Sequence, residues 1–141
     1  MDSEKEFLSS YNKNEYEKPS VAVDLLVFTV KDDRLKIVLV RRNEHPFKDM
    51  LSLPGVFVGI NETLDEAAAR GAREEAGLAD IYFEQLYTWG DIDRDPRMRI
   101  ISVSYLSLTP AEKLTLSAGS RTSSAELYDV EELLASGEEL A

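Results

Sequence analysis

A chain of 141 residues has the length of one ordinary domain and leaves no room for two. Hydrophobic residues make up 43% of it, which is enough for one core and excludes disordered and fibrous classes. The absence of cysteine excludes disulfides and cysteine metal sites. The single histidine, His45, argues against a metal site built from histidines and against a serine–histidine–aspartate triad.

The charge balance argues against two classes of partner. Sixteen basic residues against 27 acidic ones give a net charge of −11. A chain this acidic is poorly suited to bind nucleic acid or an anionic membrane directly. No apolar run approaches the roughly 18 residues that a membrane span needs, and the polar start of the chain lacks a signal-peptide pattern. We therefore expect a cytoplasmic protein with no membrane partner and no direct nucleic-acid contact.

The chain divides into an N-terminal arm, residues 1–18, and one domain, residues 19–141. The arm is polar and has little apolar periodicity, so we expect it to be loosely attached. Residues 20–30 and 35–42 are rich in β-branched residues on either side of a short polar break, which predicts a hairpin. A short strand is expected at residues 51–53, before Pro54 and Gly55 break it.

The clearest helix is predicted over residues 63–76. Thr63 and Glu66 have the spacing of a capping box, and Gly77 is suited to end the helix in a left-handed conformation. Strands are expected afterwards at 81–89, 99–108, 114–116 and 126–128, and a short helix at 130–134. Strands dominate without a regular strand–helix alternation, so the predicted class is α/β with a mixed sheet.

The helix at 63–76 carries the residues with the clearest chemistry. Positions 71, 74 and 75 project to one side of a helix, so Glu74 and Glu75 are expected to face whatever the Pro54–Gly55 bend holds. Two neighbouring carboxylates repel each other, and a hard divalent cation such as Mg²⁺ offsets that repulsion most easily. Such an ion can neutralise a diphosphate and polarise an attacking water.

Residues 56–78 resemble the Nudix box, the signature of the Nudix hydrolase superfamily. Seven residues stand at family positions: Glu62, Arg70, Ala72, Glu74, Glu75, Gly77 and Leu78. The resemblance implies an α/β/α sandwich with a mixed β-sheet, and Mg²⁺-assisted hydrolysis of a nucleoside diphosphate linked to another group. It also implies structural roles for Glu62, Arg70 and Gly77, with Glu62 and Arg70 holding the loop against the helix.

Two positions depart from the box. Val56 replaces its opening glycine, and Gly71 replaces the glutamate that should follow Arg70. That glutamate belongs to the metal-binding and catalytic face in the family. Gly71 fits either a close approach of the helix to a strand or relaxed selection after catalysis was lost. If the rest of the site is intact, Gly71→Glu is expected to raise hydrolysis.

The resemblance gives a reduced metal and catalytic set. Glu74, Glu75 and the carbonyl of Gly55 are the expected ligands for Mg²⁺, with Mn²⁺ as the alternative. Glu75 is expected to take part in catalysis, and Glu126 is the main candidate for a replacement base because related domains have a glutamate before the last strand. Asp91, Asp93 and Asp95 are the other candidates.

A narrower resemblance covers most of the chain. The segments that carry it are 19–30, 39–42, 45–47, 84–91, 94–97 and 103–105. They are similar to the ADP-ribose-type Nudix domain of NrtR-like transcriptional regulators of NAD metabolism and of its stand-alone relatives. This implies binding of an ADP-ribose-like nucleotide, a homodimer, and DNA contact only through a winged-helix domain that would follow residue 141.

Candidate nucleotide-binding residues lie outside the box. Arg41 and Arg42 end a strand and point to opposite faces, so one of them is expected to reach a phosphate. Phe47 follows a proline in a loop and is a candidate to stack on a base. Arg97 is a candidate diphosphate clamp, although its loop also carries enough aspartates to neutralise itself.

Three functions remain open from the sequence. The first is a ligand-sensing domain that binds the nucleotide with Mg²⁺ and has weak or lost hydrolysis. The second is an active ADP-ribose-type pyrophosphatase that releases AMP and a sugar phosphate. The third is a protein-interaction module that kept the fold and lost the pocket.

Overall fold

The computed structural model describes residues 3–141. In chain order the elements are α1 (Ser3–Ser10), the 3₁₀ turn η1 (Lys13–Glu15), β1 (Ser20–Lys31), β2 (Arg34–Arg42), β3 (Leu51–Ser52), β4 (Gly55–Phe57), α2 (Leu64–Ala76), β5 (Glu84–Trp89), β6 (Ile100–Leu108), the 3₁₀ turn η2 (Ala111–Lys113), β7 (Thr122–Asp129) and α3 (Val130–Ser136). None of the described helices has the length and apolarity needed to cross a membrane.

The sheet is built around β1. This strand pairs in parallel with β6 and antiparallel with β2 and β4, so the sheet is mixed. β3 and β7 pair with β2, and β5 pairs with the far side of β6. The main order β3-β2-β1-β6-β5 leaves β5 at an edge. The predicted hairpin is confirmed: Asp32 and Asp33, both with positive φ, join β1 to β2 in a two-residue turn.

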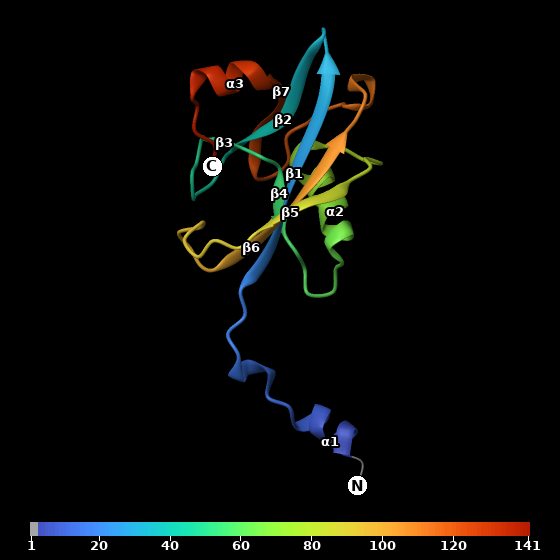
Figure 1. Cartoon of the computed structure of the whole chain (residues 1–141), viewed down its shortest axis with the longest axis vertical. Coiled ribbons are helices and arrows are strands. Elements are labelled where there is room, and N and C mark those ends of the chain that lie inside the picture. The colour runs from blue at the N-terminus through green and yellow to red at the C-terminus, as the bar shows by residue number, and fades with distance from the viewer. Residues whose placement is uncertain (1–2) are drawn as a thin grey trace.

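Helices cover both faces of the sheet, as Figure 1 shows. Val23, Leu25 and Val27 alternate along β1 and are fully buried in the core that lies under α2. Leu39 and its neighbours on the opposite face form a second apolar cluster, against which Leu133 of α3 packs. The expected α/β/α sandwich with a mixed sheet is therefore confirmed.

Two predicted strand boundaries and one predicted strand are wrong. β5 begins at residue 84, because Ile81 and Phe83 pack against the core without pairing to a neighbouring strand. The expected strand at 114–116 is irregular chain, in which two leucines reach the core without pairing to a strand. The last strand is longer than 126–128, because β7 pairs with β2 from Thr122 to Asp129.

The N-terminal arm extends away from the body of the molecule (Figure 1). All eight residues of α1 are exposed. The ring of Tyr11 lies 5.3 Å from that of Phe7 and 6.4 Å from that of Tyr16, measured between ring centroids. The arm's aromatic residues therefore contact one another, and all three remain largely exposed.

The connection between β6 and β7 rests on the last turn of α2. The Ser117 amide donates to the Ala76 carbonyl at 2.9 Å, and the Thr122 hydroxyl donates to the Glu75 carbonyl at 3.3 Å. These bonds satisfy carbonyl groups that a helix end otherwise leaves unpaired. Gly119 allows the close approach, because a Cβ there would lie 1.7 Å from the carbonyl oxygen of Glu74.

Gly119→Ala is therefore expected to lower the free energy of unfolding by about 1–3 kcal/mol, because the added methyl must displace backbone at the end of α2. Urea unfolding followed by circular dichroism measures the change. Gly90→Ala is the matched control, since a Cβ at position 90 meets nothing within 4 Å. Equal stability of the two variants would contradict the close packing described here.

Candidate functional site

Helix α2 is fixed at both ends. The hydroxyl of Thr63 accepts from the Glu66 amide at 3.1 Å, and the Glu66 carboxylate accepts from the Thr63 amide at 3.0 Å, which forms the predicted capping box. At the other end Gly77 is left-handed with φ of 71°, and a Cβ there would lie 2.0 Å from the hydroxyl of Ser117. The caps set which side chains of the last turn face the sheet.

Arg70 binds the loop before α2 to the helix. Its guanidinium donates to both carboxylate oxygens of Glu62, at 2.7 and 2.9 Å, and to the carbonyl of Phe57 at 2.7 Å. The Gly59 amide donates to the same carboxylate at 2.9 Å. Hydrogen bonds from Arg70, and then from Gly59, lower the pKa of Glu62 to about 2. Glu62 and Arg70 thus form a charge-assisted ion pair that attaches the loop to the helix, as a structural role requires; we call this ion pair the clasp.

The Pro54–Gly55 bend and the end of α2 face each other. The Glu75 side chain is buried, at 8% exposure, and its Oε1 accepts from the Gly55 amide at 3.4 Å. Burial raises the pKa of Glu75, and the Gly55 hydrogen bond opposes the rise. Gly55 itself lies against β1, because a Cβ there would meet a carboxylate oxygen of Asp24 at 2.7 Å.

Glu74 is placed differently from Glu75. Its side chain is half exposed and forms an ion pair with Arg70 at 3.1 Å. Both glutamates line a cleft that continues along the outer side of α2, together with Val56, Phe57, Arg70, Ser120 and Arg121. The two predicted carboxylates are therefore brought to one cleft, and only one of them is buried.

The residues that could hold a metal fall short of a full cluster. Gly71 supplies no carboxylate, and residues 3–141 contain no gathered group of three or more histidine, cysteine, aspartate or glutamate side chains. Glu74 and Glu75 line one cleft and Gly55 lies beside Glu75, so these residues could contribute oxygen ligands to one hard cation. They do not fit the three-carboxylate arrangement that the box implies for catalysis.

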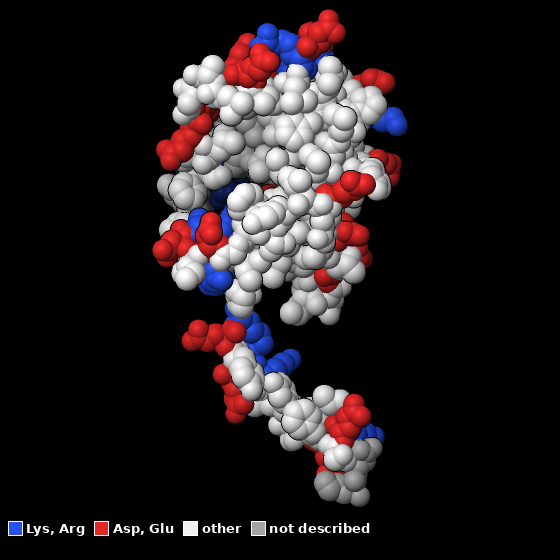
Figure 2. All heavy atoms as spheres, viewed as in Figure 1, with Lys and Arg blue, Asp and Glu red and all other residues white. Residues whose placement is uncertain are grey.

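A cavity of about 240 Å³ opens on the face of the sheet opposite α2 and reaches Glu75 at one end. The charged residues that line it are Asp24, Arg42, Glu44, Glu75, Arg94, Asp95, Arg97 and Arg121. Figure 2 shows basic side chains in a hollow at the left of the body, on a molecule whose net charge is strongly negative. Three of its four arginines are paired with acids of the same cavity, Arg94 with Asp24, Arg97 with Asp95 and Arg121 with Glu44. Among residues 3–141 no ion pair is found for Arg42, which is therefore the cavity's best-placed guanidinium for an anionic ligand.

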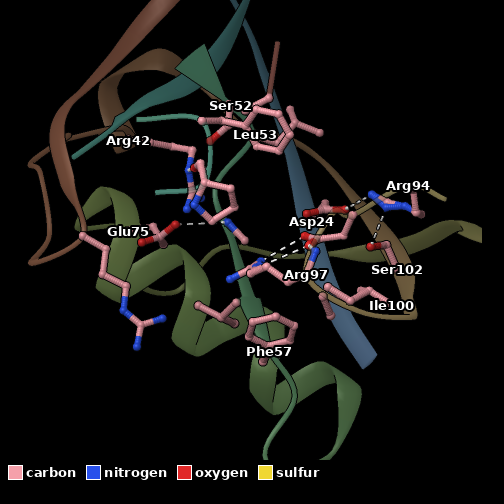
Figure 3. Close-up of a pocket in the computed structure, with 18 of the residues that line it drawn as sticks. Asp24, Arg42, Ser52, Leu53, Phe57, Glu75, Arg94, Arg97, Ile100 and Ser102 are labelled. Atoms are coloured by element: carbon pink, nitrogen blue, oxygen red, sulfur yellow. Dashed lines mark hydrogen bonds and ion pairs between the residues drawn. The ribbon is translucent and has the colours of Figure 1, made fainter. Parts of the chain in front are cut away.

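The far end of the cavity contains an ion pair that sequence reasoning missed. Arg94 lies 3.7 Å from the carboxylate of Asp24 and donates to the hydroxyl of Ser102 at 3.0 Å (Figure 3). Burial raises the pKa of Asp24, and the positive charge of Arg94 opposes the rise. The available signal was Asp24 itself, an acid in an otherwise apolar strand segment.

Arg97 and Phe57 form one wall of the cavity. The Arg97 guanidinium lies 5.3 Å from the centroid of the Phe57 ring and pairs with Asp95 at 3.0 Å. The arrangement is a cation–π contact on a half-buried ring. Arg97 was a predicted ligand residue, whereas Phe57 gave no signal beyond its place inside the box.

The structure separates the two arginines at the end of β2. Arg42 lines the cavity, where its side chain donates to the Pro46 carbonyl at 2.6 Å. Arg41 is not among the lining residues and donates to the Asp49 carbonyl at 2.8 Å. Phe47 lies on the cavity rim, 42% exposed.

Glu126 is not brought to the site. It is exposed and stands opposite Leu39 in the pairing of β7 with β2, so it shares the face of the sheet that α3 covers. Its neighbours Ala125 and Leu127 point to the opposite face and join the core under α2. Neither Asp91 nor Asp93 lines the cavity, whereas Asp95 does.

Comparison with known proteins identifies the family. The sequence profile of the NUDIX domain matches residues 18–140. The chain is 36% identical over 108 residues to the "ADPR responsive transcriptional repressor NtrR" of Acinetobacter baylyi, and 39% identical over 119 residues to the "ADP-ribose pyrophosphatase" of Methanocaldococcus jannaschii. The chain belongs to the Nudix family.

The matches cover much of this chain and less of the relatives. They span 75% of this chain and 43% of the repressor, and 84% of this chain and 66% of the pyrophosphatase. The crystallised NUDIX domain of Shewanella oneidensis NrtR, solved with ADP ribose, superposes with a TM-score of 0.89 at 29% identity. That alignment covers 99% of this chain and 90% of the other.

The clasp between Arg70 and Glu62 predicts a pH-dependent contribution to stability. The pKa of Glu62 is about 2 in the folded state and about 4.3 when unfolded, so its contribution is present above pH 4.3 and is lost as pH falls toward 2. Thermal unfolding of wild type and Glu62→Gln should differ most above pH 5 and converge near pH 2. A difference that stays constant from pH 6 to pH 2 would rule out this origin.

Proposed function

We propose that this domain binds an ADP-ribose-like nucleoside diphosphate and acts as a ligand sensor with weak or lost hydrolysis. The observation that carries the proposal is the arginine-lined cavity, which reaches the buried Glu75 beside the Gly55 bend. The likeness to the NtrR repressor and to the NrtR domain solved with ADP ribose supports this ligand class.

The cavity offers separate places for the parts of such a nucleotide. Arg42 and Arg121 lie close enough to Glu75 for their charges to oppose the rise in the pKa of its carboxyl that burial causes, and guanidinium groups are well matched to phosphate oxygens. Figure 3 shows Arg42 beside Glu75. Phe57, stacked with Arg97, and Phe47 at the rim offer aromatic surface to a base. Glu74, Glu75 and the Gly55 carbonyl would hold a Mg²⁺ or Mn²⁺ ion that enters with the diphosphate, and that ion would neutralise phosphate charge.

Weak or lost turnover follows from the acids that are missing. A glycine at position 71 supplies no third carboxylate, and Glu126 is exposed and lines neither the cavity nor the cleft of Glu74 and Glu75. Asp95 and Asp24 line the cavity, but each is paired with an arginine, which opposes a role as a free base. The likeness to an ADP-ribose pyrophosphatase favours the alternative, an active enzyme in which one of these acids serves as the base.

We also propose that residues 1–18 form an arm on a Nudix domain, residues 19–141, and that this domain is a homodimer. β5 is an edge strand whose six residues are all exposed, and edge strands that carry apolar side chains favour pairing with another chain. Leu86, Tyr87 and Trp89 are its exposed apolar residues, and the rings of Tyr87 and Trp89 lie 4.6 Å apart. In this reading DNA is contacted only by a separate domain of a regulator, as the likeness to NtrR suggests.

The dimer proposal predicts that sedimentation equilibrium gives the mass of two 15.9 kDa chains. Tyr87→Glu should reduce it to one chain, because a charge in the apolar edge opposes its burial. Lys31→Glu, at the exposed tip of the β1–β2 hairpin, is the charge control and should stay dimeric. A wild-type chain that is monomeric at millimolar concentration would remove the proposal.

The ligand proposal is tested by binding, with two arginines of one strand as test and control. ADP-ribose at 100 times its Kd should stabilise wild type by about 2.7 kcal/mol in thermal unfolding. Arg42→Ala should weaken binding roughly 10- to 100-fold, the loss of one charge-assisted contact. Arg41→Ala, one residue away and outside the cavity, should leave the affinity unchanged.

A turnover assay separates the competing functions. Wild type with ADP-ribose and Mg²⁺ should release AMP slowly or not at all. Rapid release that disappears in Glu75→Gln would establish the pyrophosphatase instead. The absence of stabilisation by ADP-ribose and by other nucleoside diphosphates would favour the protein-interaction module.

A further inference from the structure

The two departures from the box are in contact with each other. Gly71 is buried on α2, one turn before Glu74 and Glu75 and on the same side of the helix. A Cβ at position 71 would lie 3.2 Å from Cγ2 and 3.6 Å from Cγ1 of Val56, and 3.5 Å from Cδ1 of Leu25. The first distance is shorter than a comfortable contact between carbon atoms. The branched side chain of Val56 therefore crowds the Cβ of any side chain at position 71 and has to shift before one can be added.

Val56 is held in this place by the strand that carries it. It is the middle residue of β4 and stands opposite Val23 in the pairing with β1. Val23 is fully buried in the core under α2, and the side chain of Val56 packs against the same cluster. Because neighbouring strand positions face opposite ways, Val56 cannot turn away from the helix without disturbing Gly55 and Phe57 on either side.

Val56 also lines the cleft that holds Glu74 and Glu75. A glutamate at position 71, one turn before these two acids, would have its Cβ against Val56 and Leu25, both apolar. Burying a carboxylate there with no cation or donor beside it is strongly unfavourable. The position is thus closed by bulk and by polarity together.

We propose that Val56 and Gly71 are a matched pair that blocks the third metal-ligand position. Neither Gly71→Glu alone nor Val56→Gly alone then rebuilds a three-carboxylate site. Val56 is a positioning residue, because it acts by excluding a side chain from α2. This inference rests on the proposed function only in taking Glu74 and Glu75 as the remaining acids of that site. It also changes the expectation for Gly71→Glu. This substitution should raise hydrolysis only when Val56 is also replaced by a smaller residue.

The contact is tested first by stability, without nucleotide or metal. Gly71→Ala in the Val56→Ala background should raise Tm by about 4 °C, because alanine favours a helix over glycine and Cγ2 is absent. The same substitution in wild type should raise Tm by less than half as much or lower it, because the new Cβ meets Val56. Equal shifts in both backgrounds would overturn the proposed pairing.

The metal site is tested by Mn²⁺ binding, measured by electron paramagnetic resonance. The double variant Val56→Gly/Gly71→Glu should bind Mn²⁺ at least about tenfold more tightly than wild type, whereas Gly71→Glu alone should stay within about twofold. Val56→Gly/Gly71→Gln is the matched control, with the same shape and no charge, and should show no gain. If Val56→Gly prevents folding, Val56→Ala replaces it in each variant.

Two results of the Mn²⁺ measurement would also overturn the proposal. One is that Gly71→Glu alone binds Mn²⁺ as tightly as the double variant does, and the other is that the folded double variant binds it no more tightly than the glutamine control. AMP release from ADP-ribose should follow the Mn²⁺ affinities and rise at least about 100-fold in the double variant over Gly71→Glu alone. Neither the stability nor the Mn²⁺ measurement uses a nucleotide. Failure of wild type to bind ADP-ribose would therefore count against the proposed function and leave this inference intact.

Discussion

The position of the site depends on the guanidinium of Arg70. It binds the Glu62 carboxylate and the Phe57 carbonyl at once, so the chain between β4 and α2 is held to the side of the helix. That attachment fixes the position of β4 along α2 and so brings the Gly55 amide to the Glu75 carboxylate. A weaker attachment would let the bend and the acid move apart, and the cavity and the cleft would no longer meet at Glu75.

The distribution of charge explains how an acidic chain can present a site for an anion. Most acids lie on the outer surface, where water screens them. The arginines of the cavity come from loops and strand ends on one side of the sheet, where Arg94, Arg97 and Arg121 pair with nearby acids and Arg42 binds a backbone carbonyl. Local charge, more than the net charge of −11, therefore decides what this cavity attracts.

The sequence predicted the features that depend on local spacing. The capping box, the left-handed Gly77 and the contact between Glu62 and Arg70 all involve residues a few positions apart, and each is present in the structure. Features that depend on pairing between distant segments were less accessible. The side to which Glu126 points is set by its register with β2, and nothing near it in the chain encodes that register. The segment at 114–116 has the local composition of a strand, but nothing near it in the chain shows whether another strand lies beside it to pair.

The far end of the cavity shows the same limit. Asp24, Arg94 and Ser102 lie on three different elements, and only their approach in space makes them a unit. The sequence could separate Arg41 from Arg42 as pointing to opposite faces. It could not choose between the two, because the choice depends on where the loop of residues 43–50 folds back.

The contact between Val56 and Gly71 has a consequence for how this site could acquire a third carboxylate. A side chain restored at position 71 meets the valine, and a small residue restored at position 56 leaves a gap beside the helix. In the proposed pairing each single exchange brings no gain in metal binding, and the gain comes only with the second. A three-carboxylate site therefore lies two coordinated substitutions away from this sequence, a longer path than an exchange at position 71 alone suggests.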